Sequence, residues 1–272
     1  MIRPSLRHGL VVATRGGVAT AAVATAGHVI APGLATLATL VAAVAIVGFE
    51  LSRVRASIDR RLDAIEADIA QIEPLGALRD RLVTRRPLPA MRGYAIAPDF
   101  ALLLTELIAD ERPELVVETG SGVSTLVIAY SLEKLGRGRV IALDHDPGYA
   151  AATRAELERH GLSGYATVVD APLSPIEIDG ERYRWYDRAA LAGLPPIDLA
   201  IDDGPPRHLG AMLRYASLPE LAPRLSPRGV FVLNVIADEE REILARWRRR
   251  FPEFHHQLLD TKKGDAILRR RP

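Results

Sequence analysis

The stretch that decides the fold is Leu115-Val116-Val117-Glu118-Thr119-Gly120-Ser121-Gly122-Val123-Ser124-Thr125. An apolar run leads into two closely spaced glycines, and a segment that can form a helix follows them. Gly120 and Gly122 allow a tight turn and let a ligand approach the backbone, while the free amides of the next helix face that ligand. The stretch predicts a buried strand, a glycine loop and a helix that hold a nucleotide-like ligand. An ordinary glycine loop without a ligand is the alternative.

Two residues narrow the choice of ligand. Thr125 stands where the dinucleotide fingerprint G-x-G-x-x-G has its third glycine, which disfavours NAD. Glu118 suits a positively charged ligand, because a carboxylate can pair with an ammonium directly or through water. An acid followed by G-x-G resembles the first motif of the class I S-adenosylmethionine-dependent methyltransferases. This resemblance covers roughly residues 94 to 270 and implies S-adenosylmethionine as the cofactor.

The rest of that region alternates between strand and helix patterns, which predicts an α/β fold with a doubly wound, mainly parallel sheet and helices on both faces. The resemblance implies a Rossmann-like sheet of seven strands with an antiparallel terminal strand. The expected strands are Leu115–Glu118, Arg139–Leu143, Ala166–Val169, Asp198–Ile201 and Gly229–Leu233, followed by a hairpin of Phe254–Leu259 and Asp265–Leu268. The expected helices are Asp99–Glu111, Val123–Leu135, Pro147–His160, Leu209–Leu221 and Asp238–Arg250.

In such a sheet the ligand lies across the carboxyl ends of the strands, and several of these ends carry acids. Asp144 follows the second strand, where a carboxylate can accept both ribose hydroxyls, although NAD enzymes share this feature. His145 then lies beside the nucleoside by position, with helix capping or a surface role as the alternative for it. The resemblance implies that Asp170 and the small Ala171 contact the adenine amine. The residues expected at the cofactor are Glu118, Gly120, Ser121, Gly122, Ser124, Thr125, Asp144, His145, Asp170, Ala171 and Asp202.

The fourth strand ends in Asp202-Asp203-Gly204, which is the expected catalytic edge. The run resembles a subset of small-molecule O-methyltransferases, some of which bind a divalent metal there. Those members have further acids after the fifth strand, whereas this chain has Asn234, so we expect no required metal. A hydroxyl acceptor also needs a base, and Asp203 or His208 is expected to supply it.

Other side chains near this edge have two interpretations each. Arg207 and Arg214 can hold an anionic substrate, or lie on a solvated helix face as arginines more often do. Trp185 and Tyr186 can line a substrate pocket, although packing in the core is the more common role of such residues.

The composition of the 272 residues sets wider limits. Hydrophobic residues make up 48% of the chain, which is enough for one α/β domain with an appendage. The net charge of +1 gives no general attraction to nucleic acid, so no nucleic-acid partner is expected. The absence of cysteine excludes disulfides and thiolate chemistry and is consistent with a reducing compartment.

The N-terminal part differs from the rest, because no Asp, Glu, Lys or Arg occurs from Gly16 to Phe49. As one helix this run would be roughly 50 Å long, which exceeds a bilayer core of about 30 Å. We expect residues 1–49 to be a membrane anchor, formed by one span near Val29 to Phe49 or by a hairpin turning at Ala31-Pro32-Gly33. A signal peptide and a buried soluble helical hairpin are the alternatives. Arginines on both sides favour a cytoplasmic location for both ends and for the catalytic domain.

Residues 50–93 join the anchor to the domain at 94–272. Apolar residues recur every three or four positions from Leu51 to Ile72, with charges between them, which predicts an amphipathic helix. This stripe can form a short coiled coil in a homodimer, or pack on the domain or the membrane. The segment Arg85-Arg86-Pro87-Leu88-Pro89 then indicates a linker.

These observations favour a membrane-anchored methyltransferase that uses S-adenosylmethionine on an oxygen of a small-molecule, glycan or lipid-linked acceptor. A nucleotide-dependent oxidoreductase of the NAD class is one alternative. A membrane-tethered protein that binds a nucleoside without catalysis is the other.

Overall fold

The computed structural model describes residues 32–234 and 237–271. The described chain divides into two compact units, and the boundary lies between Asp68 and Ile69. The expected first arm of a membrane hairpin and the arginines before it lie outside the described residues.

The described residues of the first unit form one helix, α2 (Pro32–Ile69), of 38 residues, whose last residue already belongs to the second unit. At 1.5 Å per residue it is about 57 Å long, and it joins the second part of the charge-free run, from Pro32 to Phe49, to most of the amphipathic stripe without a break. Most of its large apolar side chains are exposed, from Leu37 to Ile69. By length and composition alone, this helix can cross a membrane.

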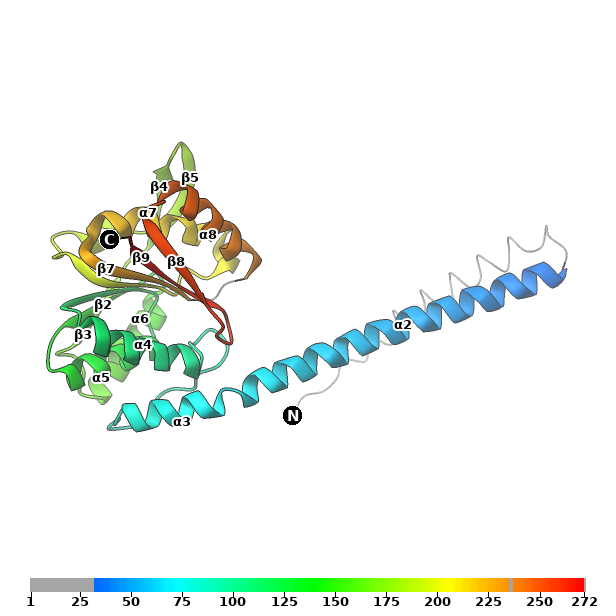
Figure 1. The fold of residues 1–272 in the computed structure, drawn as a ribbon, viewed down its shortest axis with the longest axis horizontal. Coiled ribbons are helices and arrows are strands. Elements are labelled where there is room, and N and C mark those ends of the chain that lie inside the picture. Colours follow the sequence, from blue (N-terminus) through cyan, green and yellow to red (C-terminus); the bar gives the residue numbers. More distant parts are fainter. Residues whose placement is uncertain (1–31, 235–236, 272) are drawn as a thin grey trace. The chain divides into compact units, whose positions relative to one another are not determined.

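The second unit is built on a seven-stranded sheet in the order β3-β2-β1-β6-β7-β9-β8 (Figure 1). The five strands β3, β2, β1, β6 and β7 are parallel, whereas β9 runs antiparallel between β7 and β8. This topology confirms the predicted fold class. The strands are β1 (Leu115–Thr119), β2 (Arg139–Asp144), β3 (Ala166–Asp170), β6 (Ile197–Asp202), β7 (Leu225–Asn234), β8 (Phe254–Leu259) and β9 (Asp265–Arg270).

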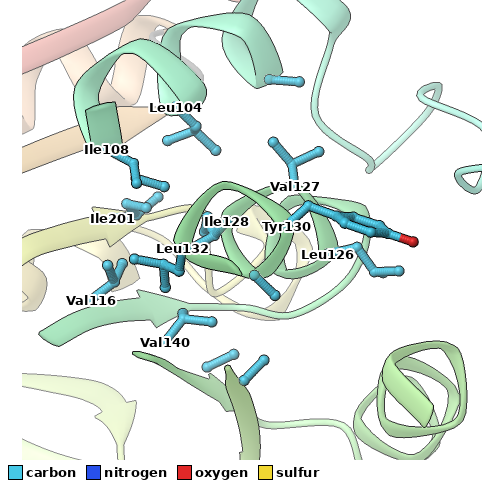
Figure 2. Packing of buried hydrophobic residues seen from close by; sticks show 14 of the residues in the cluster. Leu104, Ile108, Val116, Leu126, Val127, Ile128, Tyr130, Leu132, Val140 and Ile201 are labelled. Atoms are coloured by element: carbon cyan, nitrogen blue, oxygen red, sulfur yellow. The ribbon is translucent and has the colours of Figure 1, made fainter. Parts of the chain in front are cut away.

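Helices cover both faces of the sheet (Figure 1). Successive strand residues point to opposite faces, so Val116 packs in one core and its neighbour Val117 in the other. Figure 2 shows part of the first core, where Leu132 of one helix lies beside Val116. Its helices are α3 (Ile72–Arg81), α4 (Pro98–Glu111), α5 (Val123–Leu135) and α6 (Pro147–Arg159). The other face carries α7 (Ser217–Leu221), α8 (Asp238–Arg250) and a hairpin of β4 (Leu173–Ile178) and β5 (Glu181–Tyr186).

The expected helix over residues 209–221 is wrong in its bounds, because only its last part, Ser217–Leu221, is α-helical. The chain instead forms short 3-10 turns around α7, because Gly210 and Met212 have φ angles of 155° and 55° that a helix does not contain. The 3-10 turns of the second unit are η2 (Arg188–Leu191), η3 (Arg207–Leu209), η4 (Leu213–Ala216) and η5 (Ala222–Arg224).

Candidate active site

The glycine loop after β1 lies against the loop after β6. Gly120 has a φ of 93°, and its amide donates to the carbonyl of Leu143 at 2.8 Å. A Cβ on Gly120 would lie 3.2 Å from the backbone oxygen of Asp203. The amide of Asp203 in turn donates to the carbonyl of Thr119 at 3.1 Å. Glycine is thus required for its backbone angle and for the close approach of the two loops.

Glu118 is fully buried beneath this loop. Its Oε2 accepts a hydrogen bond from the Thr125 hydroxyl at 2.6 Å, and that hydroxyl accepts one from the Gly122 amide at 3.1 Å. Thr125 stands where a dinucleotide fold has glycine, and its hydroxyl connects the glycine loop to the Glu118 carboxyl group. The second oxygen, Oε1, has no hydrogen-bond partner among the described residues. Burial raises the pKa of Glu118 to about 8, although the Ser124 and Thr125 hydroxyls oppose the shift.

Asp144 ends β2 and is buried beside the loop. It accepts hydrogen bonds from the Ser121 hydroxyl at 2.5 Å and from the Asp146 amide at 3.0 Å. The next residue, His145, has its Nδ1 3.7 Å from Oδ1 of Asp144, and this nitrogen has no hydrogen-bond partner in the described part of the chain. The structure thus brings together Ser121, Asp144 and His145, which the sequence placed at the cofactor.

The two residues at the end of β3 that were expected at the cofactor, Asp170 and Ala171, have different surroundings. Ala171 is buried, and its amide donates to the carbonyl of Asp144 at 2.7 Å. Asp170 is exposed and accepts from Arg154 at 3.1 Å. Ala171 therefore lies beside Asp144, whereas the Asp170 carboxylate pairs with a surface arginine.

The two acids that follow one another at the end of β6 have different surroundings. Asp202 is buried and accepts from the hydroxyls of Thr119 at 2.7 Å and Ser217 at 2.9 Å. It also pairs with Nε of Arg214 at 3.3 Å. Burial raises the pKa of Asp202 and Arg214 opposes that effect. These partners occupy both carboxylate oxygens of Asp202, which the sequence placed at the cofactor.

The position of Arg214 agrees with neither of the two roles expected from the sequence. It is 4% exposed, so it lies neither on a solvated helix face nor open to an anionic substrate. Its charge is compensated by Asp202 and by Glu240, whose Oε1 lies 3.8 Å from Nη1. Arg214 therefore stabilises the buried acids that support the β6 loop.

Asp203 is only partly buried and faces the glycine loop with its backbone. Burial raises its pKa to about 7, and the nearby cations of Arg214 and Lys263 oppose this shift. A carboxyl that titrates near neutrality can accept a proton in a reaction at physiological pH.

Tyr186 reaches the same region from the end of β5. Its side chain is fully buried, and its hydroxyl has no hydrogen-bond partner among the described residues. A Cβ on Gly204 would lie 2.6 Å from this hydroxyl, which explains the glycine after Asp203. Burial raises the pKa of Tyr186 well above its usual value. Trp185, in contrast, packs in the core and donates its indole N–H to Ser217 at 3.0 Å.

Lys263 is a residue of this edge that the sequence analysis missed. It lies in the turn between β8 and β9, and the pairing of Asn234 with Asp265 brings that turn to the carboxyl end of β7. Its Nζ donates to the carbonyls of Gly93 at 3.1 Å and Ala95 at 2.6 Å. Burial lowers the pKa of Lys263, while Asp203 raises it. The antiparallel hairpin of β8 and β9, which the sequence predicted, is the signal that could have placed this turn at the catalytic edge.

His208, the other expected base, lies exposed in η3, and its ring centroid is 6.2 Å from that of Tyr94. Asn234 is buried and donates to Asp265 at 2.7 Å. In residues 32–234 and 237–271, no three His, Asp or Glu side chains are grouped so as to hold a metal ion. The expectation that no metal is required stays a prediction.

The sequence of residues 117–234, which includes the glycine loop and the ends of β1, β2, β3 and β6, matches the family model of a methyltransferase domain. This part of the chain is a class I methyltransferase domain. The assignment confirms the resemblance seen in the sequence, and S-adenosylmethionine is the cofactor of this class of domain.

Two curated relatives share part of the methyltransferase domain. A ribosomal protein L11 methyltransferase from Chloroflexus aurantiacus is 28% identical over 152 residues, which cover 53% of this chain and 44% of that protein. A protein-L-isoaspartate O-methyltransferase from Methanopyrus kandleri is 36% identical over 96 residues, 34% of this chain and 41% of that protein. The chain spans less than half the length of each of these relatives.

Solved structures show the same fold. The methyltransferase PaMTH1 of Podospora anserina, bound to SAH, superposes with a TM-score of 0.51 at 16% identity. The cofactor-bound protein Rv0187 from MTB superposes with a TM-score of 0.50 at 19% identity. Each likeness covers 79% of this chain and 96% of the other.

Proposed function

We propose that this chain is an S-adenosylmethionine-dependent methyltransferase, held at a membrane by α2, that methylates an oxygen of a small-molecule, glycan or lipid-linked acceptor. The observation that carries the cofactor assignment is Oε1 of Glu118, a buried acid oxygen without a hydrogen-bond partner in the described chain. An ammonium group on the ligand would supply that partner and stabilise the ionised carboxylate. The anionic pyrophosphate that a dinucleotide places at the glycine loop would not.

The residues around the glycine loop fit the rest of the cofactor. Asp144 at the end of β2 is the proposed partner of the ribose hydroxyls, and the unpartnered Nδ1 of His145 would offer a further polar contact. Gly120 and Gly122 leave the loop without side chains where the ligand approaches. When bound, the cofactor supplies a methyl group on a positively charged sulfur.

Asp203 is the proposed base. The Asp203 carboxylate would accept the proton of the acceptor hydroxyl. The bound cofactor would supply the methyl group to the acceptor oxygen, and cleavage of its S–CH3 bond would leave a neutral thioether. Arg214 and Lys263 hold the pKa of Asp203 down to about 7, so that a substantial fraction is ionised at neutral pH. His208, exposed beside Tyr94, is the second candidate base.

The proposal of an oxygen acceptor depends on this base, because the names of the two curated relatives differ in their acceptors, a ribosomal protein and an isoaspartyl protein.

Location at the membrane is supported by α2, whose charge-free part from Pro32 to Phe49 is about 27 Å long, close to the thickness of the hydrocarbon core. The arginines that follow it, Arg53, Arg55, Arg60 and Arg61, support a cytoplasmic position for the domain.

The test is calorimetric titration of the full chain, in uncharged detergent micelles, with S-adenosylmethionine, S-adenosylhomocysteine and NAD. We expect micromolar binding of the first two and none of NAD. Gly120→Arg and Asp144→Ala should abolish or greatly weaken binding, whereas Asp203→Ala should bind normally and lose methyl transfer. Binding of NAD alone would replace the proposal with an oxidoreductase, and normal binding by Gly120→Arg would remove the glycine loop from the cofactor site.

A further inference from the structure

A second group of polar side chains lies on β8, an edge strand of the sheet, away from the glycine loop in the topology. A hollow of about 260 Å³ is lined there by residues from α8, β8 and the chain after β9. Four of its six lining residues are basic and none is acidic. The lining residues are Arg248, Pro252, Phe254, His255, His256 and Arg271.

The cations of this hollow differ from the arginines around it. Nearby arginines have acidic partners, such as Arg246 with Glu242 at 3.1 Å and Arg269 with Glu111 at 2.7 Å. Within the part of the chain that the structure describes, no acid lies within ion-pair distance of Arg248, His255 or Arg271. The positive charge of the hollow is therefore not neutralised by the protein.

His256 supplies a second, independent observation. Both of its ring nitrogens are shielded from solvent, and neither has a hydrogen-bond partner among the described residues. An imidazole carries at least one N–H, and leaving that donor buried without an acceptor costs free energy. An acceptor brought by a ligand would remove this cost. Burial lowers the pKa of His256 to about 4, and Arg248, His255 and Arg271 add to the effect.

From this geometry we infer that the hollow is a binding site for a phosphoryl group, carried by a lipid headgroup or by a phosphorylated small molecule. Two guanidinium groups offer planar pairs of donors that match phosphate oxygens. Phe254 and Pro252 form an apolar part of the lining for the organic portion of the ligand. A bound phosphoryl group accepts from the His256 N–H and compensates the charges of Arg248 and Arg271 beside it.

The test follows the imidazole of His256 by NMR in the full chain in uncharged detergent micelles. His256→Asn assigns the resonance. One sample is titrated with glycerol phosphate, and a second is doped with phosphatidylglycerol. We expect the pKa of His256 to rise by about one unit or more with one of these probes, with a Kd in the millimolar range or below. The probe that acts tells which source supplies the phosphoryl group.

Matched variants test the location. Arg248→Gln and Arg271→Gln should weaken the response about tenfold. Arg249→Gln removes a neighbouring exposed charge that does not line this hollow and should leave the response unchanged. The nearest acid in sequence, Glu253, is exposed and outside the lining, so Glu253→Gln is a second neutral control. A His256 resonance that neither probe moves, or equal losses in Arg249→Gln and Arg248→Gln, would overturn the inference.

Discussion

At the scale of single residues, Glu118 couples stability to ligand binding. Its folded pKa of about 8 lies above the unfolded value, so the folded chain holds a proton that the unfolded chain has lost between about pH 4.5 and 8. Stability therefore falls as pH rises through this window. Glu118→Gln cannot ionise, so the melting temperature of the variant minus that of the parent should increase from pH 5.5 to pH 8.5 in the absence of ligand.

The same variant separates stability from function. If a cationic cofactor ionises Glu118, binding at pH 7 should release about one proton in the parent and none in Glu118→Gln. Calorimetry in two buffers of different ionisation enthalpy measures this number. Equal proton release by the two proteins would mean that Oε1 does not face the ligand's charge.

Lys263 sets the protonation of Asp203 from a different element. Its cation lowers the pKa of Asp203, so Lys263→Met should raise that pKa above its value of about 7, whereas Lys263→Arg should not. Carboxyl ¹³C NMR of aspartate-labelled protein measures the titration, with Asp203→Asn to assign the signal. A purely structural role in holding Gly93 and Ala95 would lower stability in Lys263→Met but leave the pKa of Asp203 in place.

At the scale of elements, local sequence patterns predicted those parts of the domain that repeat a regular period. The helices at Val123 and Asp238 and the strands of the parallel sheet agree with their apolar periodicity to within a few residues. The hairpin of β4 and β5 was missed although Asp179-Gly180, both with positive φ, is a typical turn for it. Pro74 lies in the first turn of α3, where a missing N–H is tolerated.

The candidate site could be predicted only in part. The ends of the parallel strands placed Glu118, Asp144 and Asp203 at one edge, because strand order follows from topology. The roles of Asp202, Arg214 and Tyr186 depend on burial and on partners far away in sequence, which no local pattern contains. Lys263 is separated from Asp203 by two further strands and two α-helices, so only the complete fold brings them together.

Arg214 ties three elements together and carries a prediction at this scale. It lies in η4 and compensates Asp202 of β6 and Glu240 of α8. Arg214→Met leaves the buried Asp202 without a cation and leaves Glu240 with Arg207 alone, whose Nε lies 3.8 Å from Oε1. We expect the free energy of unfolding to fall by about 3–5 kcal/mol. Adding Asp202→Asn should recover part of this loss, because one of the two charges is removed. Denaturant unfolding measures both variants, and an unchanged midpoint in Arg214→Met would show that the buried charges need no partner.

At the scale of the whole molecule, the apolar half of α2 is the feature that a soluble methyltransferase has no need for. Its exposed Leu40, Val41 and Val44 would contact water in a soluble protein, whereas a lipid bilayer covers them without further protein contacts. The amphipathic half from Leu51 onward carries charges and does not need the hydrocarbon core. Substitution of an apolar residue by arginine is therefore expected to disrupt membrane association in the apolar half of α2 but not in its amphipathic half.

Fractionation of cells that express the full chain tests this difference. The parent should stay in the membrane fraction after washing with high salt and alkaline carbonate, because apolar burial rather than charge holds it there. Val41→Arg with Val44→Arg adds two arginines near the bilayer centre, each costing about 2.5–3.5 kcal/mol on insertion scales, and should move the protein to the soluble fraction. Leu62→Arg in the amphipathic half is the matched control and should remain with the membrane. A parent that is soluble without detergent would remove the anchor, and with it the proposal of an acceptor at the membrane.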